Sequence, residues 1–347
     1  TSDGQSPLSL TPLEPVELCY SVQPFCVSRS YLMALSLGVH IGQQNLSMDE
    51  LRVLWRRLDD AGVDWISIWD HLYEAPYQGG NEPHFEALTT LATLAADTQH
   101  ARIGCLVFCV GYRNPALLAK AATTLDHISN GRFELGLGAG WHIWEAVAHG
   151  YPFPDIGTRL DMLEEGVEII SQMLTQERTS YSGRHYQVDE VSCFPRPQQS
   201  KLPIWIGGRG EKRTLELVAR YADGWNAAYV SPEEFKHLNE VLEEWCSTSG
   251  RNSSEIKRGV NVAFAMGIDQ SSVALQQKAM HDSWGNTAAN ISEGALMCTP
   301  DAASERIIEY VESGVDELNI ALRAPWDDAA LEVYLEDVVP TIRKATA

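Results

Sequence analysis

Long apolar runs are missing from this chain of 347 residues. The longest spans Ile103–Gly111, which is the length of a strand and far below the ~18 residues that cross a bilayer as a helix. Hydrophobic residues make up 44% of the chain and charged residues 21%. This composition excludes a fibre and a disordered chain, and we expect a globular protein without a membrane partner.

Positive charge is scarce. Lysine and arginine number 26 against 47 aspartates and glutamates, so the formal net charge is −21. Such a field repels phosphate, which argues against nucleic acid and anionic membranes as main partners. The expected partner is a small molecule, and a local basic pocket remains able to hold a phosphate.

Cysteine motifs are also absent. The seven cysteines contain no CxxC pair and no zinc-finger spacing with histidine. Cys105 and Cys109 share one apolar run, where strand rise separates them by roughly 13 Å, too far for a disulfide. We therefore expect buried free thiols, a reducing cytoplasmic location and no metal. No GxSxG or HExxH motif supports a hydrolase or a metalloenzyme.

What the sequence does contain, from residue 33 onward, is a regular alternation of strand-length apolar runs and amphipathic helical stretches. The expected strands are 35–41, 63–69, 102–110, 133–138, 202–206, 224–228, 260–266 and 317–322. The expected helices are 47–61, 84–99, 115–128, 159–174, 211–221, 232–246, 301–312 and 327–343. Eight such units predict a (β/α)8 TIM barrel of the α/β class, with a doubly wound open sheet as the alternative.

Four segments depart from a minimal barrel. Residues 1–32 contain four prolines and no period, which predicts a poorly ordered N-terminal extension ahead of a domain at 33–347; an arm covering the barrel bottom is the alternative. Residues 141–158 and 176–201 are long loop insertions, and 270–299 is expected to carry an extra helix. Long ordered loops on a barrel are often functional.

The carboxyl ends of barrel strands face the active site. This rule selects His40, Asp70, His71, residues 109–112, Gly140, Trp141, His142, residues 207–210, Asn226, Tyr229 and Arg323. Asp70 and His71 stand out, because a carboxylate beside an imidazole tunes a proton donor or acceptor near neutral pH. The alternative is a histidine that only ends a strand.

Two glycine-rich segments follow strands. Gly207, Gly208, Arg209 and Gly210 join a strand to a helix, and backbone N–H groups at a helix N-terminus bind anions. The alternative is an ordinary turn; without Gly-Lys-Ser/Thr it is not a P-loop. The run from Gly136 to Gly140 indicates close backbone approach around a bound ring, with Trp141 as its wall. Core packing of Trp141 is the competing interpretation.

At this point the chain resembles a known family, the bacterial luciferase-like superfamily of flavin-dependent barrels, and in particular its branch that uses the deazaflavin coenzyme F420. The resemblance covers Met33–Ala347. It lies in Tyr112–Lys120, Thr124–Arg132, Leu135–Trp141, Tyr151–Pro154, Arg159–Glu165, Pro203–Gly208 and Ala222–Trp225.

The resemblance implies site roles. His71 is the expected proton relay beside the deazaflavin ring, and Asp70 a partner that contacts the ring. A bulge with a non-proline cis peptide is expected at Leu106–Val107, backing the ring. Gly140 and Trp141 are expected near the ring or the phosphate-bearing tail, and Gly207, Gly208, Arg209 and Gly210 around the tail phosphate.

The implied function is an F420-dependent oxidoreductase that transfers a hydride between C5 of the deazaflavin and a small organic substrate, as a homodimer. One departure is notable: Phe108–Gly111 reads Phe-Cys-Val-Gly where many relatives carry a polar Thr-Gly-Asn-like stretch, so the ring pocket is more apolar. An FMN-dependent luciferase-like monooxygenase is the alternative, and a non-catalytic flavin-binding barrel is a third.

Overall fold

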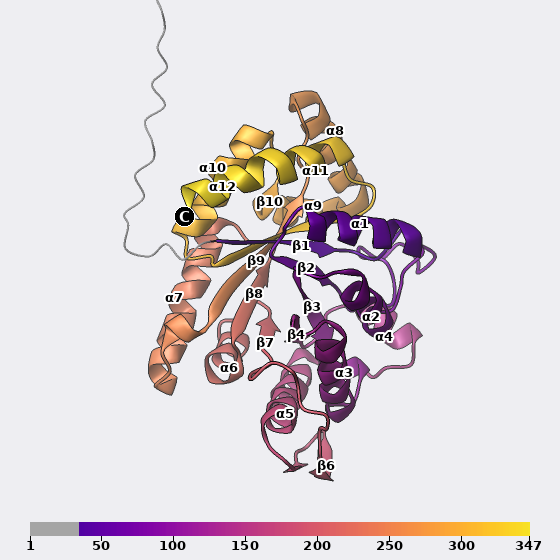
Figure 1. Ribbon diagram of the computed structural model, residues 1–347, viewed down its shortest axis with the longest axis vertical. Coiled ribbons are helices and arrows are strands. Elements are labelled where there is room, and N and C mark those ends of the chain that lie inside the picture. The colour runs from indigo at the N-terminus through magenta and orange to yellow at the C-terminus, as the bar shows by residue number, and fades with distance from the viewer. Residues whose placement is uncertain (1–34) are drawn as a thin grey trace, which may run out of the picture. The chain divides into compact units, whose positions relative to one another are not determined.

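Eight parallel strands close into a barrel in the computed structural model, which describes residues 35–347 (Figure 1). The strands are β1 Ser36–Ile41, β2 Trp65–Ile68, β3 Arg102–Cys109, β4 Phe133–Gly138, β7 Ile204–Gly207, β8 Gly224–Ala228, β9 Lys257–Phe264 and β11 Glu317–Leu322. They neighbour one another in this order, and β11 pairs with β1 to close the ring. The predicted TIM barrel is confirmed, and the open sheet is wrong. The expectations for residues 1–32 lie outside the described residues.

Local sequence signals explain where the barrel helices begin. These helices are α1 Met48–Asp60, α2 Ala87–Asp97, α3 Pro115–Ile128, α5 Ile156–Thr175, α6 Thr214–Tyr221, α7 Pro232–Ser249 and α10 Pro300–Glu312. Ser47 and Glu50 form the predicted capping box of α1. The helix predicted from residue 84 begins later, because the Glu86 side chain accepts hydrogen bonds from the N–H groups of Leu88 and Thr89 and caps α2.

Several other boundaries differ from prediction by a few residues, and two of these differences have a local cause. Strand β9 begins at Lys257 rather than at 260, because Arg258 is buried with its guanidinium hydrogen-bonded to the carbonyls of Ser253 and Ile256. The last helix is divided into α11 Asp328–Val333, the π-helical turn η4 Tyr334–Val338 and α12 Val339–Ala345. Pro340 has no N–H for an i→i−4 bond, so the ladder reorganises just before it.

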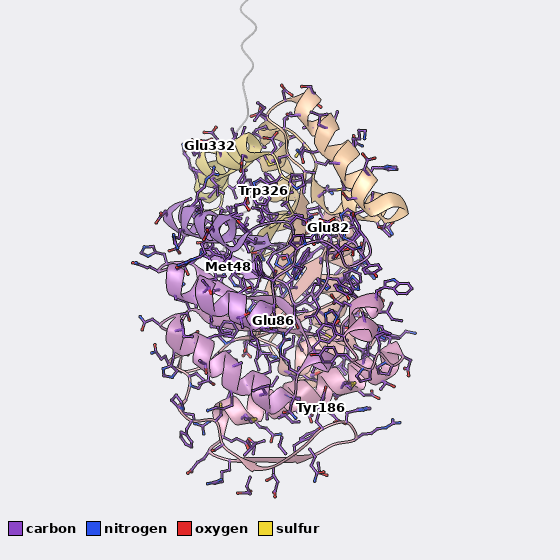
Figure 2. All side chains as sticks on the ribbon, turned by 90° about the vertical axis from the view of Figure 1, so that its right-hand side faces the viewer. Met48, Glu82, Glu86, Tyr186, Trp326 and Glu332 are labelled. Atoms are coloured by element: carbon purple, nitrogen blue, oxygen red, sulfur yellow. The ribbon has the colours of Figure 1, made fainter. Side chains whose placement is uncertain are left out.

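The three loop insertions lie at different places on the barrel. Residues 141–158 contain α4 Ile143–Ala148, and 270–299 contain α8 Gln270–Trp284, η3 Gly285–Thr287, α9 Ala288–Glu293 and the short strand β10 Ala295–Leu296. Residues 176–201 form the hairpin β5 Thr179–Ser182 and β6 Gln187–Val191. This hairpin lies against α5, with Tyr186 labelled near the bottom of Figure 2. Residues of the 141–158 and 270–299 insertions, by contrast, line the cavity at the carboxyl ends of the strands.

The amino ends of the strands enclose a charged layer. Arg102 on β3 donates to Glu134 on β4 at 2.7 Å and to Glu317 on β11 at 2.5 Å. The Trp205 indole N–H also donates to Glu134. Burial raises the pKa of Glu317 to about 7, against the opposing effect of Arg102. This layer fills the bottom of the barrel, so the open space lies at the opposite end.

The raised pKa of Glu317 predicts a pH-dependent stability. Because the folded pKa lies above the ordinary value of 4.5, the folded state holds the proton more tightly than the unfolded chain. The resulting stabilisation is present below about pH 4.5 and is lost as the pH rises through about 7, on the order of 3 kcal/mol in all. Glu317→Gln removes this titration, so its free energy of unfolding should rise relative to the wild type between about pH 5 and pH 8. Urea unfolding measures this, with exposed Glu244→Gln as control; parallel profiles for wild type and Glu317→Gln contradict it.

Candidate functional site

A cavity of about 660 Å³ opens at the carboxyl ends of the strands. Every residue predicted for the site lines it: Asp70, His71, Leu106, Val107, Gly140, Trp141, Gly207, Gly208, Arg209 and Gly210. His40, Cys109, Tyr112, Asn226, Tyr229 and Arg323 line it too. Val110, Gly111 and His142 do not line it; Nδ1 of His142 accepts the N–H of Glu145. Most residues that were selected because they follow a strand thus lie around one cavity, although they come from distant parts of the chain. Their chemical roles stay predictions.

His71 is held by a carboxylate that the sequence analysis missed. Its Nδ1 lies 2.8 Å from Oε1 of Glu145 on α4, and the Glu145 side chain is only 1% exposed. Since a carboxylate only accepts, Nδ1 carries the hydrogen of this bond and Nε2 is the other proton site. Glu145 belongs to the 141–158 insertion, and nothing in its sequence position marks it as the partner of a residue 74 positions away.

Glu145 also accepts bonds from three other groups. These donors are the N–H groups of Leu72 and Tyr73, at 2.7 and 3.2 Å, and the Tyr112 hydroxyl at 2.8 Å. Burial raises the pKa of Glu145, but the hydrogen bonds and the charge of His71 outweigh it and lower the pKa to about 2. The carboxylate is therefore ionised at neutral pH and fixes the His71 ring.

Asp70 is paired with Arg113 and not with the neighbouring His71. Arg113 donates to both of its oxygens, at 2.6 and 2.8 Å, and the N–H of Cys109 donates at 2.9 Å. Arg113 also reaches Glu86, which Figure 2 labels. The structure shows no hydrogen bond between Asp70 and His71 among the described residues, and the roles of Asp70 beside His71 and the ring stay predictions. Asp70 ties the end of β2 to the end of β3.

The expected non-proline cis peptide is confirmed at Leu106–Val107, where the pairing of β3 with β4 shifts register between Cys105 and Phe108. The glycines beside it make room for this bulge. A Cβ on Gly138 would lie 2.5 Å from Val107, and one on Gly207 would lie 2.9 Å from it. The glycine run at 136–140 thus lies close to strand β3. Approach to a bound ring stays a prediction.

Trp141 lies at the mouth of the cavity. Its side chain is 60% exposed, and its ring meets His71 edge-on with centroids 5.1 Å apart. Core packing of Trp141 is therefore wrong, and the position as a wall of the cavity is confirmed. Gly140 precedes it with φ +77°, in the left-handed region that favours glycine, and its approach to Cys109 Sγ leaves no space for a Cβ.

The turn between β7 and α6 has the backbone of an anion site. No side chain caps the first turn of α6, and of its leading N–H groups that of Leu215 donates to the Gly210 carbonyl at 3.1 Å. Gly208 has φ +140° and brings the turn beside Thr214 at the start of the helix. The side chain of Arg209 is 52% exposed and lies 3.3 Å from Glu234. Its charge is thus shared with a carboxylate, and anion binding at this turn stays a prediction.

The other end of the cavity is aromatic. Trp69 contacts both His40, at 6.0 Å between ring centroids, and His71, at 5.2 Å. The His40 ring bonds to Ser67 at 2.9 Å, and burial, Arg323 and His71 lower its pKa to about 3. His40 is therefore neutral. The indoles of Trp69 and Trp284 line this end and were not selected from the sequence.

Within residues 35–347, no helix is long and apolar enough to cross a membrane, and no cluster of three or more His, Cys, Asp or Glu has a geometry suited to a metal ion.

The luciferase-like monooxygenase family model matches residues 30–317. An F420-dependent glucose-6-phosphate dehydrogenase of Microbacterium testaceum (strain StLB037) is 27% identical over 337 residues, covering 90% of this chain and 99% of that protein. A solved F420-dependent secondary alcohol dehydrogenase, in complex with an F420-acetone adduct, superposes with a TM-score of 0.79 at 18% identity, over 89% of this chain and 99% of the other. The monooxygenase RslO1 from Streptomyces bottropensis superposes at 0.72 with 19% identity, over 88% and 99%. At these identities the two structures show the fold alone.

The four donors on Glu145 predict a large cost for its removal. Glu145→Ala leaves buried N–H and O–H groups without an acceptor, which should lower the free energy of unfolding by about 2–4 kcal/mol. Urea unfolding at neutral pH measures the loss. Glu305→Ala, at an exposed position, is the control and should change stability by less than about 0.5 kcal/mol. Equal losses in the two variants would show that the Glu145 bonds contribute no net stability.

Proposed function

The chain belongs to the luciferase-like monooxygenase family, and we propose on this premise that it is an oxidoreductase that uses coenzyme F420 to transfer a hydride to or from a small organic substrate. Similarity over nearly the full length to an F420-dependent dehydrogenase supports the cofactor. The observation that carries the proposal is the His71–Glu145 pair, which faces the same cavity as the β3 bulge and the β7–α6 turn.

The residues present suit a deazaflavin with an anionic tail. Leu106 and Val107 offer an apolar ledge, and the three glycines of the β7–α6 turn let the backbone approach a phosphate. About 660 Å³ accommodates a ring system together with a small substrate. When bound, F420 supplies the carbon that donates or accepts the hydride.

The chain's own contribution is to hold a proton and to shape the cavity. With Nδ1 of His71 bonded to Glu145, Nε2 is the atom that exchanges the proton accompanying hydride transfer. Trp69 and Trp141 contact His71 from two directions and limit its contact with water. A positioned acid–base group of this kind is typically worth 10²–10⁴-fold in rate.

We also propose a homodimer acting in the cytoplasm. The luciferase-like resemblance supports the dimer, and light scattering tests it. The cysteines within the described residues that carry free thiols, Cys105, Cys109, Cys193, Cys246 and Cys298, support a reducing compartment.

Cofactor binding discriminates between the two luciferase-like functions. We expect the purified protein to bind F420, followed by its fluorescence, and to bind FMN at least about tenfold more weakly, a difference of about 1.4 kcal/mol. Oxygen uptake by the protein with reduced FMN, together with no F420 binding, would contradict the proposal and establish the monooxygenase. F420 binding without turnover across alcohols, aldehydes and activated alkenes would favour a binding protein.

His71→Ala tests the proton role. Because the ring exchanges a proton and does not hold the cofactor tail, we expect kcat to fall by about 10²–10⁴-fold while F420 affinity stays within about threefold. Steady-state kinetics and fluorescence titration measure the two quantities. His100→Ala, at an exposed position, is the control. Full activity of His71→Ala would remove the proposed role.

A further inference from the structure

Arg323, directly after β11, lies in a box of aromatic rings at the far end of the cavity. Its guanidinium carbon is 4.7 Å from the ring centroid of Trp69 and 5.0 Å from those of Tyr229 and Trp284. These rings come from three different parts of the chain: the end of β2, the end of β8 and the end of α8. Such cation–π contacts orient a guanidinium without neutralising it.

The guanidinium has no carboxylate partner within ion-pair distance among residues 35–347. Its hydrogen bond goes from Nη2 to the Tyr229 hydroxyl, and Nε is enclosed without a partner. The other arginine lining the cavity, Arg209, pairs with Glu234. A half-buried cation without a counter-ion is costly, and here it persists in a chain with 47 acidic and 26 basic residues. This pattern indicates that the missing counter-ion is a ligand.

Arg323 also stands at a junction. It and Trp284 line both the main cavity and a second cavity of about 300 Å³. Apart from Arg323, Glu82 is the charged residue lining the second cavity, and Figure 2 labels it. The other lining residues are neutral, among them Gln44, Asn45, Gln78, Gln276, Ser283, Phe264 and Met280. A ligand at the junction therefore meets the positive charge of Arg323, and the part that extends into the second cavity meets mostly neutral walls with Glu82 as the one acidic residue among those that line it.

We propose that Arg323 binds a carboxylate of the substrate, so that the substrate class is a small organic monocarboxylic acid whose remainder extends toward the second cavity. This deepens, and rests on, the function proposed above. The rings hold the guanidinium in place, and a planar carboxylate matches its donor fork. A phosphate monoester carries about −1.5 to −2 charges and finds a single cation here. Trp69, which contacts both Arg323 and His71, places the acid within reach of the proton relay.

The test uses benzoate and acetate as probes, benzamide and acetamide as their neutral isosteres, and inorganic phosphate, each titrated calorimetrically into the purified full-length protein. The wild type should bind each acid at least about tenfold more tightly than its amide, since charge-assisted bonds are the stronger ones. Arg323→Met should abolish this preference. Arg323→Lys, which keeps the charge and loses the fork, should show an intermediate preference and provides a second variant if Arg323→Met does not fold.

Cofactor affinity separates this inference from the proposed function. Arg323→Met should keep F420 affinity within about twofold, whereas Arg209→Met should weaken F420 and leave benzoate binding unchanged. Arg56→Met, at an exposed position, controls for loss of surface charge. Benzoate binding that depends on Arg323 in a protein that does not bind F420 would support the carboxylate site and overturn the proposed F420-dependent function.

Three outcomes would overturn the carboxylate site itself. Phosphate binding more tightly than either acid would assign another oxyanion. Equal binding of acids and amides by the wild type would show that the site does not recognise the negative charge of the ligand. Parallel loss of F420 and benzoate in Arg323→Met would assign the arginine to the cofactor.

Discussion

The buried carboxylate of Glu145 is the interaction on which the functional end of this barrel depends. It joins three segments that are distant in sequence: the residues after β2 through His71 and the Leu72 and Tyr73 N–H groups, the turn after β3 through Tyr112, and α4 of the 141–158 insertion. A carboxylate with so many donors stays ionised, and an ionised acceptor fixes which nitrogen of His71 carries hydrogen. The chemistry proposed for His71 follows from this one bond.

Close approach of backbones is the second constraint. The β3 bulge at Leu106–Val107 pushes the Val107 side chain between β4 and β7, and it fits because Gly138 and Gly207 lack a Cβ. Asp70 and Arg113 secure the same bulge from the β2 side, with the Cys109 N–H bonded to Asp70. The apolar ledge of the cavity is therefore a product of packing between neighbouring strands.

The arginines of the barrel differ in how their charge is balanced. Within the barrel, Arg102 and Arg113 each contact two carboxylates, so their charges are balanced internally. Arg323 differs because rings, rather than carboxylates, surround it. In a strongly acidic protein, a cation that has no carboxylate partner among residues 35–347 selects for one negative charge on the ligand that enters the cavity.

The sequence by itself determined the barrel and the edge at which its chemistry lies. Eight apolar runs alternating with helices specify the fold, since period and length are local properties, and the rule of strand ends then selects His71, Trp141 and Arg323 together. A local signal also placed the Ser47 capping box, whereas the position of the cis peptide followed from the family resemblance. The pairing of His71 with Glu145, and of Asp70 with Arg113, was decided by tertiary structure. Each carboxylate has a histidine near it in sequence that is an equally plausible partner, His71 beside Asp70 and His142 before Glu145. Only the folded positions of α4 and the β3 turn determine which partner each carboxylate has. The same is true of the rings around Arg323, because they come from the ends of β2, β8 and α8, and no local pattern predicts that these meet.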